Sequence, residues 1–158
     1  MKLALFDIDG VLANDSHRVK YALDRQWFKY FDKKLMAADT LWSQGRALVD
    51  RCMAEDWVIA YLTGRREDRR QVTEDWLDDN GLPCGRLVMR SFSDIMPLAN
   101  FKERYIRNVV ARENYTDVVL FDDDPEVIRF VQDQVGPDNA IHCTWHVKET
   151  PLVKLAKV

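Results

Sequence analysis

The sequence predicts an α/β fold, a three-layer, doubly wound parallel sheet of about five strands. Short apolar runs alternate along the chain with stretches of helical periodicity, the pattern of parallel strands joined by helices. Several of these runs are apolar throughout, as strands buried on both faces should be. With 158 residues, 47% of them hydrophobic and 31% charged, the chain is expected to form a single globular domain over residues 1–158.

The expected strands are short apolar runs with polar or turn residues at their ends. They are residues 2–7, 57–62, 86–90, 117–122 and 139–144. Between them, apolar residues recur at helical spacing in three stretches. The stripes are Val72, Trp76 and Leu77; Phe101, Tyr105, Ile106, Val109 and Val110; and Val127, Ile128, Val131 and Val135. Gly81 follows the first stripe and is predicted to cap that helix at its C-terminus.

One segment, between the first strand and a helix expected from about Leu41, does not fit this alternation. Its apolar and aromatic residues fall on one helical face. They are Val19, Leu23, Trp27, Tyr30 and Phe31. We therefore expect residues 16–39 to form a small helical insertion. It is either a cap or lid beside the first loop or an additional helix on the sheet edge.

Composition limits the function classes. The net charge of −3 argues against a protein that coats long nucleic acids by charge alone, although a local basic site is compatible with it. No apolar segment is long enough to span a membrane, so no membrane association is expected. Three cysteines without CxxC spacing fit a reduced compartment, and we expect a cytoplasmic protein.

Polar clusters follow three of the expected strands. Asp7 and Asp9 come after the first, Thr63-Gly64-Arg65 after the second and Asp122-Asp123-Asp124 after the fourth. Lys102 lies early in the helix that leads into the fourth strand. Ligands of open parallel sheets bind beyond the carboxyl ends of the strands, so these groups are expected to meet in one site.

The combined chemistry of these groups indicates phosphoryl transfer to a carboxylate. Strand geometry places Asp7 and Asp9 on the same side, and Asp122 and Asp123 bring the total to about four negative charges, which repel without a cation. Oxygen ligands of this kind suit Mg²⁺. Phosphate oxygens would be bound by Thr63, the Gly64 amide and Lys102. Gly10 lets the backbone turn tightly past the acids.

On these residues the sequence resembles the haloacid dehalogenase (HAD) superfamily of aspartyl-phosphate phosphatases, which has a Rossmann-like core. Four motifs match in order across nearly the whole chain. They are Asp7-Ile8-Asp9-Gly10-Val11, Leu62-Thr63-Gly64-Arg65, Lys102 and Phe121-Asp122-Asp123. The combination is specific, whereas any one of the motifs alone would be weak.

The resemblance implies a role for each matched residue. Asp7 would be the nucleophile, and Asp9 would protonate the leaving oxygen and then activate water. Thr63 and Lys102 would hold phosphoryl oxygens. Mg²⁺ would be bound by the Asp7 carboxylate, the Asp9 backbone carbonyl and Asp123, with Asp122 acting through a water molecule. Asp124 matches no motif position and is expected to be a helix N-cap before Pro125.

A narrower resemblance is to the 3′-phosphatase domain of phage-type polynucleotide kinases. Arg18, eleven residues after Asp7, and Arg65, two after Thr63, match arginines of that domain and would bind substrate. Thr63 stands where that subfamily often has serine, a mild departure because the hydroxyl is kept. The chain has no GxxxxGK[ST] phosphate-binding loop, so no kinase activity is expected of it.

The leading hypothesis is a Mg²⁺-dependent phosphomonoesterase that removes 3′-phosphates from nucleic-acid ends or nucleotides, with no obligate protein partner evident. A phosphatase of free deoxynucleotides or another small metabolite is the alternative. A phospho-aspartate receiver module is disfavoured by motif order, because Lys102 precedes the last acid pair. A HAD-fold binding protein without activity gains little support, because every catalytic position is filled.

Three further patterns have simple structural explanations. Arg65, Arg66, Arg69 and Arg70 would share a helical face, either as a patch for a polyanion or, except for Arg65, as a solvated face paired with nearby acids. His142, Cys143 and His146 do not have the spacing of a four-ligand zinc site, so packing is favoured. Trp27, Phe28, Tyr30 and Phe31 could stack nucleobases, although at helical spacing most such residues belong to the core.

Overall fold

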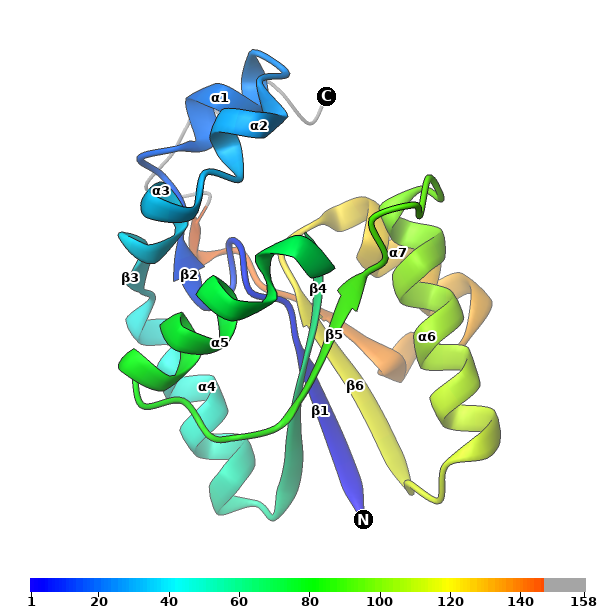
Figure 1. The fold of residues 1–158 in the computed structure, drawn as a ribbon. Coiled ribbons are helices and arrows are strands. Elements are labelled where there is room, and N and C mark those ends of the chain that lie inside the picture. The colour runs from blue at the N-terminus through cyan, green and yellow to red at the C-terminus, as the bar shows by residue number, and fades with distance from the viewer. Residues whose placement is uncertain (147–158) are drawn as a thin grey trace.

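The structure is a computed structural model that describes residues 1–146. Within this part of the chain, five parallel strands form a sheet of order β5-β4-β1-β6-β7 (Figure 1). The strands are β1 (Lys2–Phe6), β4 (Trp57–Arg66), β5 (Arg86–Arg90), β6 (Asp117–Asp122) and β7 (Ala140–His142). The expected five-stranded α/β fold is confirmed. The expected domain, residues 1–158, extends beyond the described part.

The strand register explains where the site forms. From β1 the chain builds outward to β4 and β5 on one side and to β6 and β7 on the other, so the order switches at β1. Phe6, the last residue of β1, pairs with Tyr61 of β4 and Phe121 of β6. The residues that follow these three positions therefore meet beyond the carboxyl ends of the strands, at the switch point where such folds bind ligands.

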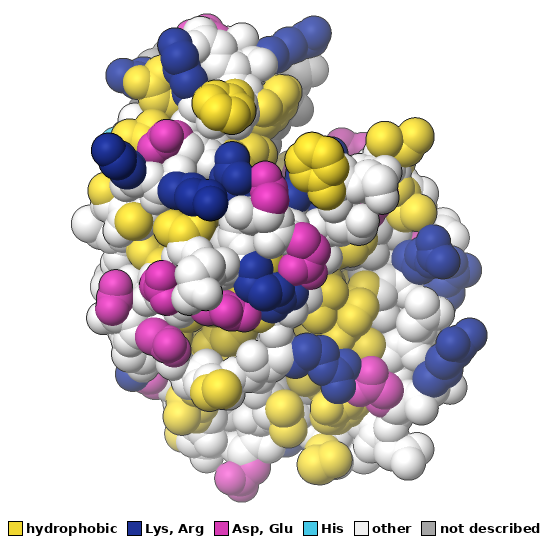
Figure 2. Space-filling view, in the orientation of Figure 1, with side chains coloured by type: hydrophobic (Ala, Val, Ile, Leu, Met, Phe, Trp, Pro, Cys, Tyr) yellow, Lys and Arg dark blue, Asp and Glu magenta, His cyan; other side chains and the backbone are white. Residues whose placement is uncertain are grey.

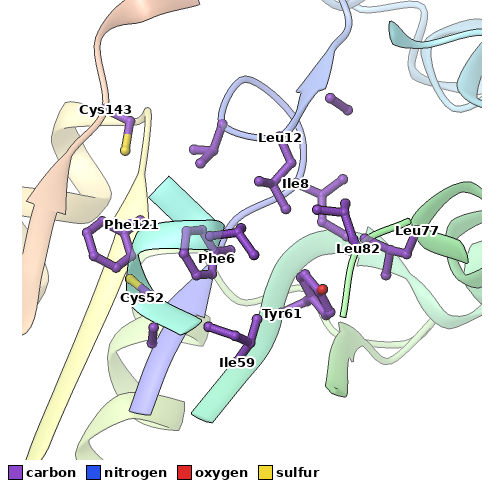
Figure 3. Close-up of a cluster of buried hydrophobic side chains, with 14 of the residues drawn as sticks. Phe6, Ile8, Leu12, Cys52, Ile59, Tyr61, Leu77, Leu82, Phe121 and Cys143 are labelled. Carbon is purple, nitrogen blue, oxygen red and sulfur yellow. The ribbon is translucent and has the colours of Figure 1, made fainter. Parts of the chain in front are cut away.

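Helices cover both faces of the sheet (Figure 1). They are α4 (Ser43–Ala54) and α5 (Arg70–Asp79) on one face, and α6 (Leu98–Arg112) and α7 (Pro125–Gln134) on the other. Two apolar clusters fill the spaces between the layers. One gathers Phe6, Tyr61 and Phe121 with side chains of α4 and α5, and Figure 3 shows part of it. The other gathers Leu5, Leu62 and Leu120 with side chains of α6 and α7.

The insertion consists of short helices between two paired strands. Strands β2 (Ala13–Asn14) and β3 (Thr40–Leu41) are antiparallel, and between them lie α1 (Val19–Leu23), α2 (Trp27–Tyr30) and α3 (Lys33–Ala37). The segment lies beyond the carboxyl ends of the sheet strands rather than along a sheet edge (Figure 1). The single helical face predicted for Val19 to Phe31 is wrong. The chain turns between α1 and α2, where Arg25 has a positive φ of 55°.

Some element boundaries differ from those predicted. Strand β4 continues to Arg66, with a register shift against β5 after Leu62, so Thr63, Gly64 and Arg65 are strand residues. A short 3₁₀ turn (Glu67–Arg69) separates the end of β4 from α5. Leu41 belongs to β3, and α4 begins at Ser43. A second 3₁₀ turn (Pro137–Asn139) precedes β7.

Two predicted caps are confirmed. Gly81 follows α5 with φ +62°, the left-handed conformation typical of a residue that ends a helix. Asp124 caps α7, since its side chain accepts a hydrogen bond from the Glu126 amide and Pro125 occupies the first turn.

Cys52, Cys84 and Cys143 are free thiols. In the described part of the chain, no helix has the length and apolarity needed to cross a bilayer.

Candidate active site

Three carboxylates meet at the carboxyl ends of β1 and β6. The Asp7 amide donates to the Phe121 carbonyl at 2.9 Å, which continues the pairing of the two strands past the end of β1. Asp7, Asp122 and Asp123 each offer a carboxylate oxygen, and these oxygens all lie within 4.8 Å of one another. The predicted convergence of Asp7 with Asp122 and Asp123 is present.

Lys102 of α6 is buried beneath this cluster. Its Nζ lies 3.0 Å from Asp7 Oδ1 and 2.6 Å from Asp122 Oδ2. Burial alone would lower the pKa of Lys102, but the two carboxylates raise it above its ordinary value, so the ammonium group is retained. Asp122 also accepts a hydrogen bond from the Asp124 amide at 2.9 Å through its other oxygen. It is therefore held on both sides.

The cluster contains more negative than positive charge. Burial raises the pKa of Asp7 well above its ordinary value, and the charges of Asp122 and Asp123 raise it further, although Lys102 opposes them. A divalent cation would relieve this excess, and an oxygen-only donor set suits Mg²⁺. The residues therefore fit the expected metal. The Asp9 carboxylate is not part of the group of oxygens, in keeping with the expectation that Asp9 contributes its backbone carbonyl.

Gly10 is required at its position by both conformation and space. Its φ is +86°, a region that residues with a side chain rarely adopt. A Cβ atom at this position would lie 2.5 Å from Asp123 Oδ2. The backbone therefore passes close to the carboxylate cluster only because residue 10 has no side chain, as the sequence predicted.

Asp9 is paired with two arginines. Arg65 donates to both carboxylate oxygens, from Nε at 3.1 Å and from Nη2 at 2.8 Å. Arg18 donates from Nη2 at 2.5 Å. Burial would raise the pKa of Asp9, but Arg65 and Arg18 together bring it well below its usual range. Asp9 is therefore a carboxylate in this state of the site.

A second buried carboxylate, Asp39, completes this network. Arg18 donates to Asp39 from Nε at 2.8 Å and Nη2 at 2.6 Å, and Arg65 from Nη2 at 3.3 Å. His17 Nε2 lies 2.8 Å from the same carboxylate. The backbone carbonyl of Asp39 accepts from the Trp76 indole of α5 at 2.8 Å. Sequence reasoning missed Asp39, which lies at the end of the insertion and outside every motif.

The residues predicted to bind substrate are only partly at the pocket surface. Gly64 and Arg65 contribute to the walls of the pocket described below and Arg18 does not, although both arginine side chains are fully buried. Thr63 is also fully buried, and its Oγ1 accepts from the Arg65 amide at 3.2 Å. Both arginines are thus held against carboxylates, and a direct contact with substrate remains a prediction.

Two histidines adjoin Asp123. His142 Nε2 lies 2.9 Å from the Asp123 backbone carbonyl, and His146 Nε2 lies 3.4 Å from its carboxylate. Cys143 is buried in the apolar cluster with Phe121 (Figure 3). Among the described residues, the side chains close enough together to hold a metal ion are Asp7, Asp122 and Asp123, a group that does not include these three. His146 lines the pocket, a placement that the sequence did not indicate.

A pocket of about 980 Å³ opens between the acidic cluster and the insertion. Its walls combine carboxylates of the site, aromatic side chains of the insertion and several arginines. These include Asp7, Asp9 and Asp123; Trp27, Phe28, Tyr30 and Phe31; and Arg25, Arg65, Arg66, Arg69 and Arg90. The volume is ample for a nucleotide-sized ligand.

The helical face predicted for the four arginines is wrong, because Arg65 and Arg66 end β4 and only Arg70 belongs to α5. Arg70 pairs with Glu67 and Glu74, as the solvated-face interpretation expects. Arg69 binds Asp68 and the Phe31 carbonyl. The extension of β4 is what separates these side chains.

Comparison with known proteins identifies one matching family. The family described as "Polynucleotide kinase PNKP phosphatase domain" matches residues 1–136. A search among curated proteins found no match.

Solved structures share the fold at low identity. A chain of the Pnkp1/Rnl/Hen1 RNA repair complex superposes with a TM-score of 0.72 at 18% identity, covering 91% of this chain and 42% of the other. This protein thus spans less than half of that relative. A class C acid phosphatase from Bacillus anthracis gives a TM-score of 0.61 at 12% identity, over 91% of this chain and 67% of that one. A hydrolase from Streptococcus pneumoniae gives 0.60 at 13% identity, over 98% and 100%.

The family match covers most of the chain, and the grouped acids lie with Lys102 at the switch point of the sheet. The chain therefore belongs to the polynucleotide kinase phosphatase domain family of the HAD superfamily, and it is a phosphatase.

Proposed function

We propose that the protein is a Mg²⁺-dependent phosphomonoesterase that removes 3′-phosphates from nucleic-acid ends through a phosphorylated Asp7. The observation that supports this best is the buried Asp7, held 3.0 Å from Lys102 and grouped with Asp122 and Asp123 at the pocket. A nucleophilic carboxylate needs nearby positive charge both to stay ionised and to accept a phosphate.

In the first step, a carboxylate oxygen of Asp7 attacks phosphorus and the bond to the leaving oxygen breaks. Asp9 supplies the proton to that oxygen. Because Arg18 and Arg65 hold Asp9 ionised, it must first gain this proton, which the negative charge of an arriving phosphate favours. Lys102, Thr63 and the Gly64 amide are the groups proposed to hold the phosphoryl oxygens.

In the second step, Asp9 takes a proton from water, the resulting hydroxide attacks phosphorus, and the bond from phosphorus to Asp7 breaks. Inorganic phosphate leaves and Asp9 is protonated again. The lowered pKa of Asp9 favours the carboxylate form, which is the form that this step needs. Asp7, Asp123 and the Asp9 carbonyl would hold Mg²⁺, with Asp122 through water, and the metal would supply positive charge to the phosphoryl oxygens.

The substrate assignment draws on the family and on the pocket. The matched family takes its name from polynucleotide kinase, and the pocket joins arginines to aromatic side chains. A free nucleotide would fit the same volume and is the alternative substrate.

The Pnkp1 relative comes from an RNA repair complex, so an association with repair proteins is as open to test as the expected lack of a partner. A cytoplasmic location also remains a prediction.

The central test replaces Asp7 with asparagine. With an aryl phosphate and Mg²⁺, Asp7→Asn should lose at least about a thousandfold in kcat, as nucleophile substitutions commonly do. Acid-quenched wild type should carry phosphate released by hydroxylamine, and the variant should not. Asp117→Asn, an exposed acid at the start of β6, serves as the control. Turnover at the wild-type rate by Asp7→Asn would overturn the mechanism.

Substrate choice is tested by comparing 3′-phosphorylated oligonucleotides with 3′-mononucleotides, 5′-mononucleotides and sugar phosphates. We expect the highest kcat/KM for the oligonucleotides. Equal values for mononucleotides and oligonucleotides would favour the small-metabolite alternative while leaving the mechanism intact.

A further inference from the structure

The insertion presents two aromatic side chains to the pocket and to solvent. Trp27 and Phe28 open α2, and 54% and 84% of their surfaces are exposed. Both line the pocket that contains Asp7 and Asp9. Exposed aromatic residues carry a large free-energy penalty in water, so a pair of them at the mouth of a polar pocket indicates a ligand with flat apolar surfaces.

These side chains differ from the neighbouring aromatics, which do form a small core. Tyr30 is buried, its ring lies 4.7 Å from Phe31, and the Arg18 guanidinium lies 4.5 Å over it. Trp27 packs one face toward Phe31, at 6.5 Å with an interplanar angle of 26°. Phe28 is not among the ring contacts of the described residues. Packing therefore orients Trp27 and leaves Phe28 without a core role.

Positive charge lies near the same opening. The pocket walls include Arg25 between α1 and α2, Arg66 at the end of β4, Arg69 in the 3₁₀ turn that follows, and Arg90 at the end of β5. Figure 2 shows hydrophobic side chains on the insertion at the top, with Lys and Arg side chains below them and around the adjoining hollow.

The acids in the same walls are already engaged. Asp68 pairs with Arg69 at 2.6 Å, Asp15 accepts from the Tyr30 hydroxyl at 2.5 Å, and Asp124 caps α7. Arg66 and Arg90 donate to backbone carbonyls of the loop after β5, which fixes their position. Arg90 also lies 3.6 Å from the Asp94 carboxylate through its Nε, so of these two arginines Arg66 contributes the less compensated charge. The opening thus pairs flat apolar surfaces with fixed positive charges.

Single-stranded nucleic acid has the matching chemistry, because its bases offer flat faces and its backbone carries regular negative charge. We infer that Trp27 and Phe28 form a stacking platform for the unpaired bases next to the phosphorylated 3′ end, with Arg25, Arg66 and Arg90 beside the backbone phosphates. The inference rests on the proposed function and specifies its substrate as an unpaired end. Duplex bases, stacked on one another, do not expose these faces.

The first test measures binding without turnover. In the background of Asp7→Asn, a short unphosphorylated oligothymidylate with a fluorescent label is titrated and its anisotropy recorded. Phe28→Ala and Trp27→Ala should each raise Kd about tenfold, within the range of base stacking on aromatic residues. Met53→Ala, which removes a side chain 47% exposed on α4 outside this pocket, should change Kd less than about twofold. Phe28→Trp, which keeps a flat ring, should retain binding.

The second test measures specificity with active protein. The ratio of kcat/KM for a 3′-phosphorylated single strand to that for an aryl phosphate should fall about tenfold in Phe28→Ala and stay constant in Met53→Ala. An abasic last nucleotide should reproduce this loss in wild type and add little to it in Phe28→Ala.

The outcomes separate this inference from the proposed function. Normal oligonucleotide binding with no phosphatase activity would overturn the proposed function alone. Phosphatase activity with unchanged Kd and unchanged ratio in Trp27→Ala and Phe28→Ala would overturn the platform alone. Sedimentation of a dimer that Phe28→Ala converts to monomer, with unchanged oligonucleotide binding, would assign the aromatics to a second copy of the chain and also overturn it.

Discussion

The two halves of the active site are opposite in charge balance. Around Asp7, three carboxylates are grouped with one lysine, which contacts Asp7 and Asp122, and the pKa of Asp7 is raised. Around Asp9, two carboxylates face two arginines, and the pKa of Asp9 is lowered. The negative charge of the first half exceeds its positive charge, so a bound cation would balance it. In the second half the arginines already balance the carboxylates. This difference in charge balance indicates that the carboxylates around Asp7 bind a cation, whereas the arginines around Asp9 hold that side chain in position.

The largest expected effect follows from breaking the balanced half. Arg65→Ala leaves the buried Asp39 and the largely buried Asp9 with one arginine between them, so we expect a loss of about 3–5 kcal/mol in the free energy of unfolding. Urea denaturation monitored by circular dichroism measures it. Arg86→Ala, at an exposed pair with Glu113, is the matched control and should cost at most about 1 kcal/mol. Equal losses in the two variants would show that the network adds no stability.

The next effect concerns the unbalanced half. Mg²⁺ at about a hundred times its Kd should stabilise the wild type by about 2.7 kcal/mol, because it binds only the folded cluster. A chelator should reverse the gain. Asp123→Asn removes one ligand and one charge, so it should abolish the response to Mg²⁺ without lowering the stability measured in chelator. Thermal unfolding with and without Mg²⁺ provides the comparison. A full Mg²⁺ response in Asp123→Asn would place the metal elsewhere.

The smallest effect concerns pH. The pKa of Asp9 is lowered in the folded protein, so its stabilising contribution is complete above its unfolded value of about 3.9. That contribution decreases as pH falls through the folded pKa. The difference in unfolding free energy between wild type and Asp9→Asn should therefore be constant from about pH 6 to pH 5 and shrink below about pH 4. Urea titrations at each pH measure this difference. A difference that grows toward low pH would contradict the lowered pKa.

Most of the unbalanced half could be predicted from the sequence. Asp7, Asp122 and Asp123 stand directly at strand ends, and the ends of parallel strands meet at one edge. Lys102 follows because α6 returns across the sheet with its first turns near that edge. Local spacing and sheet topology were enough to bring these residues together.

The balanced half could not be predicted in full. Asp39 reaches Arg18 and Arg65 only through the path of the insertion, which depends on the turn at Arg25 and on the bond from Trp76. No short-range sequence pattern predicts the path of the backbone through the insertion. The extension of β4 to Arg66 was hidden for a similar reason, because a register shift lets polar residues continue a strand. The exposure of Phe28 is likewise a tertiary property, since the sequence left open which of the four neighbouring aromatics join the core and which could stack nucleobases.

The paired strands β2 and β3 have a consequence for protein engineering. Ala13 and Leu41 are cross-strand partners, so the two ends of the insertion lie side by side on one rigid base. A segment attached at adjacent points can be exchanged for a longer or shorter one without moving the sheet. Arg18 binds Asp9 and is held by Asp39 and Tyr30, so an exchanged segment between residues 19 and 38 would have to keep the position of Tyr30. Grafting foreign helices into this segment would redesign substrate choice while the reacting groups stay fixed.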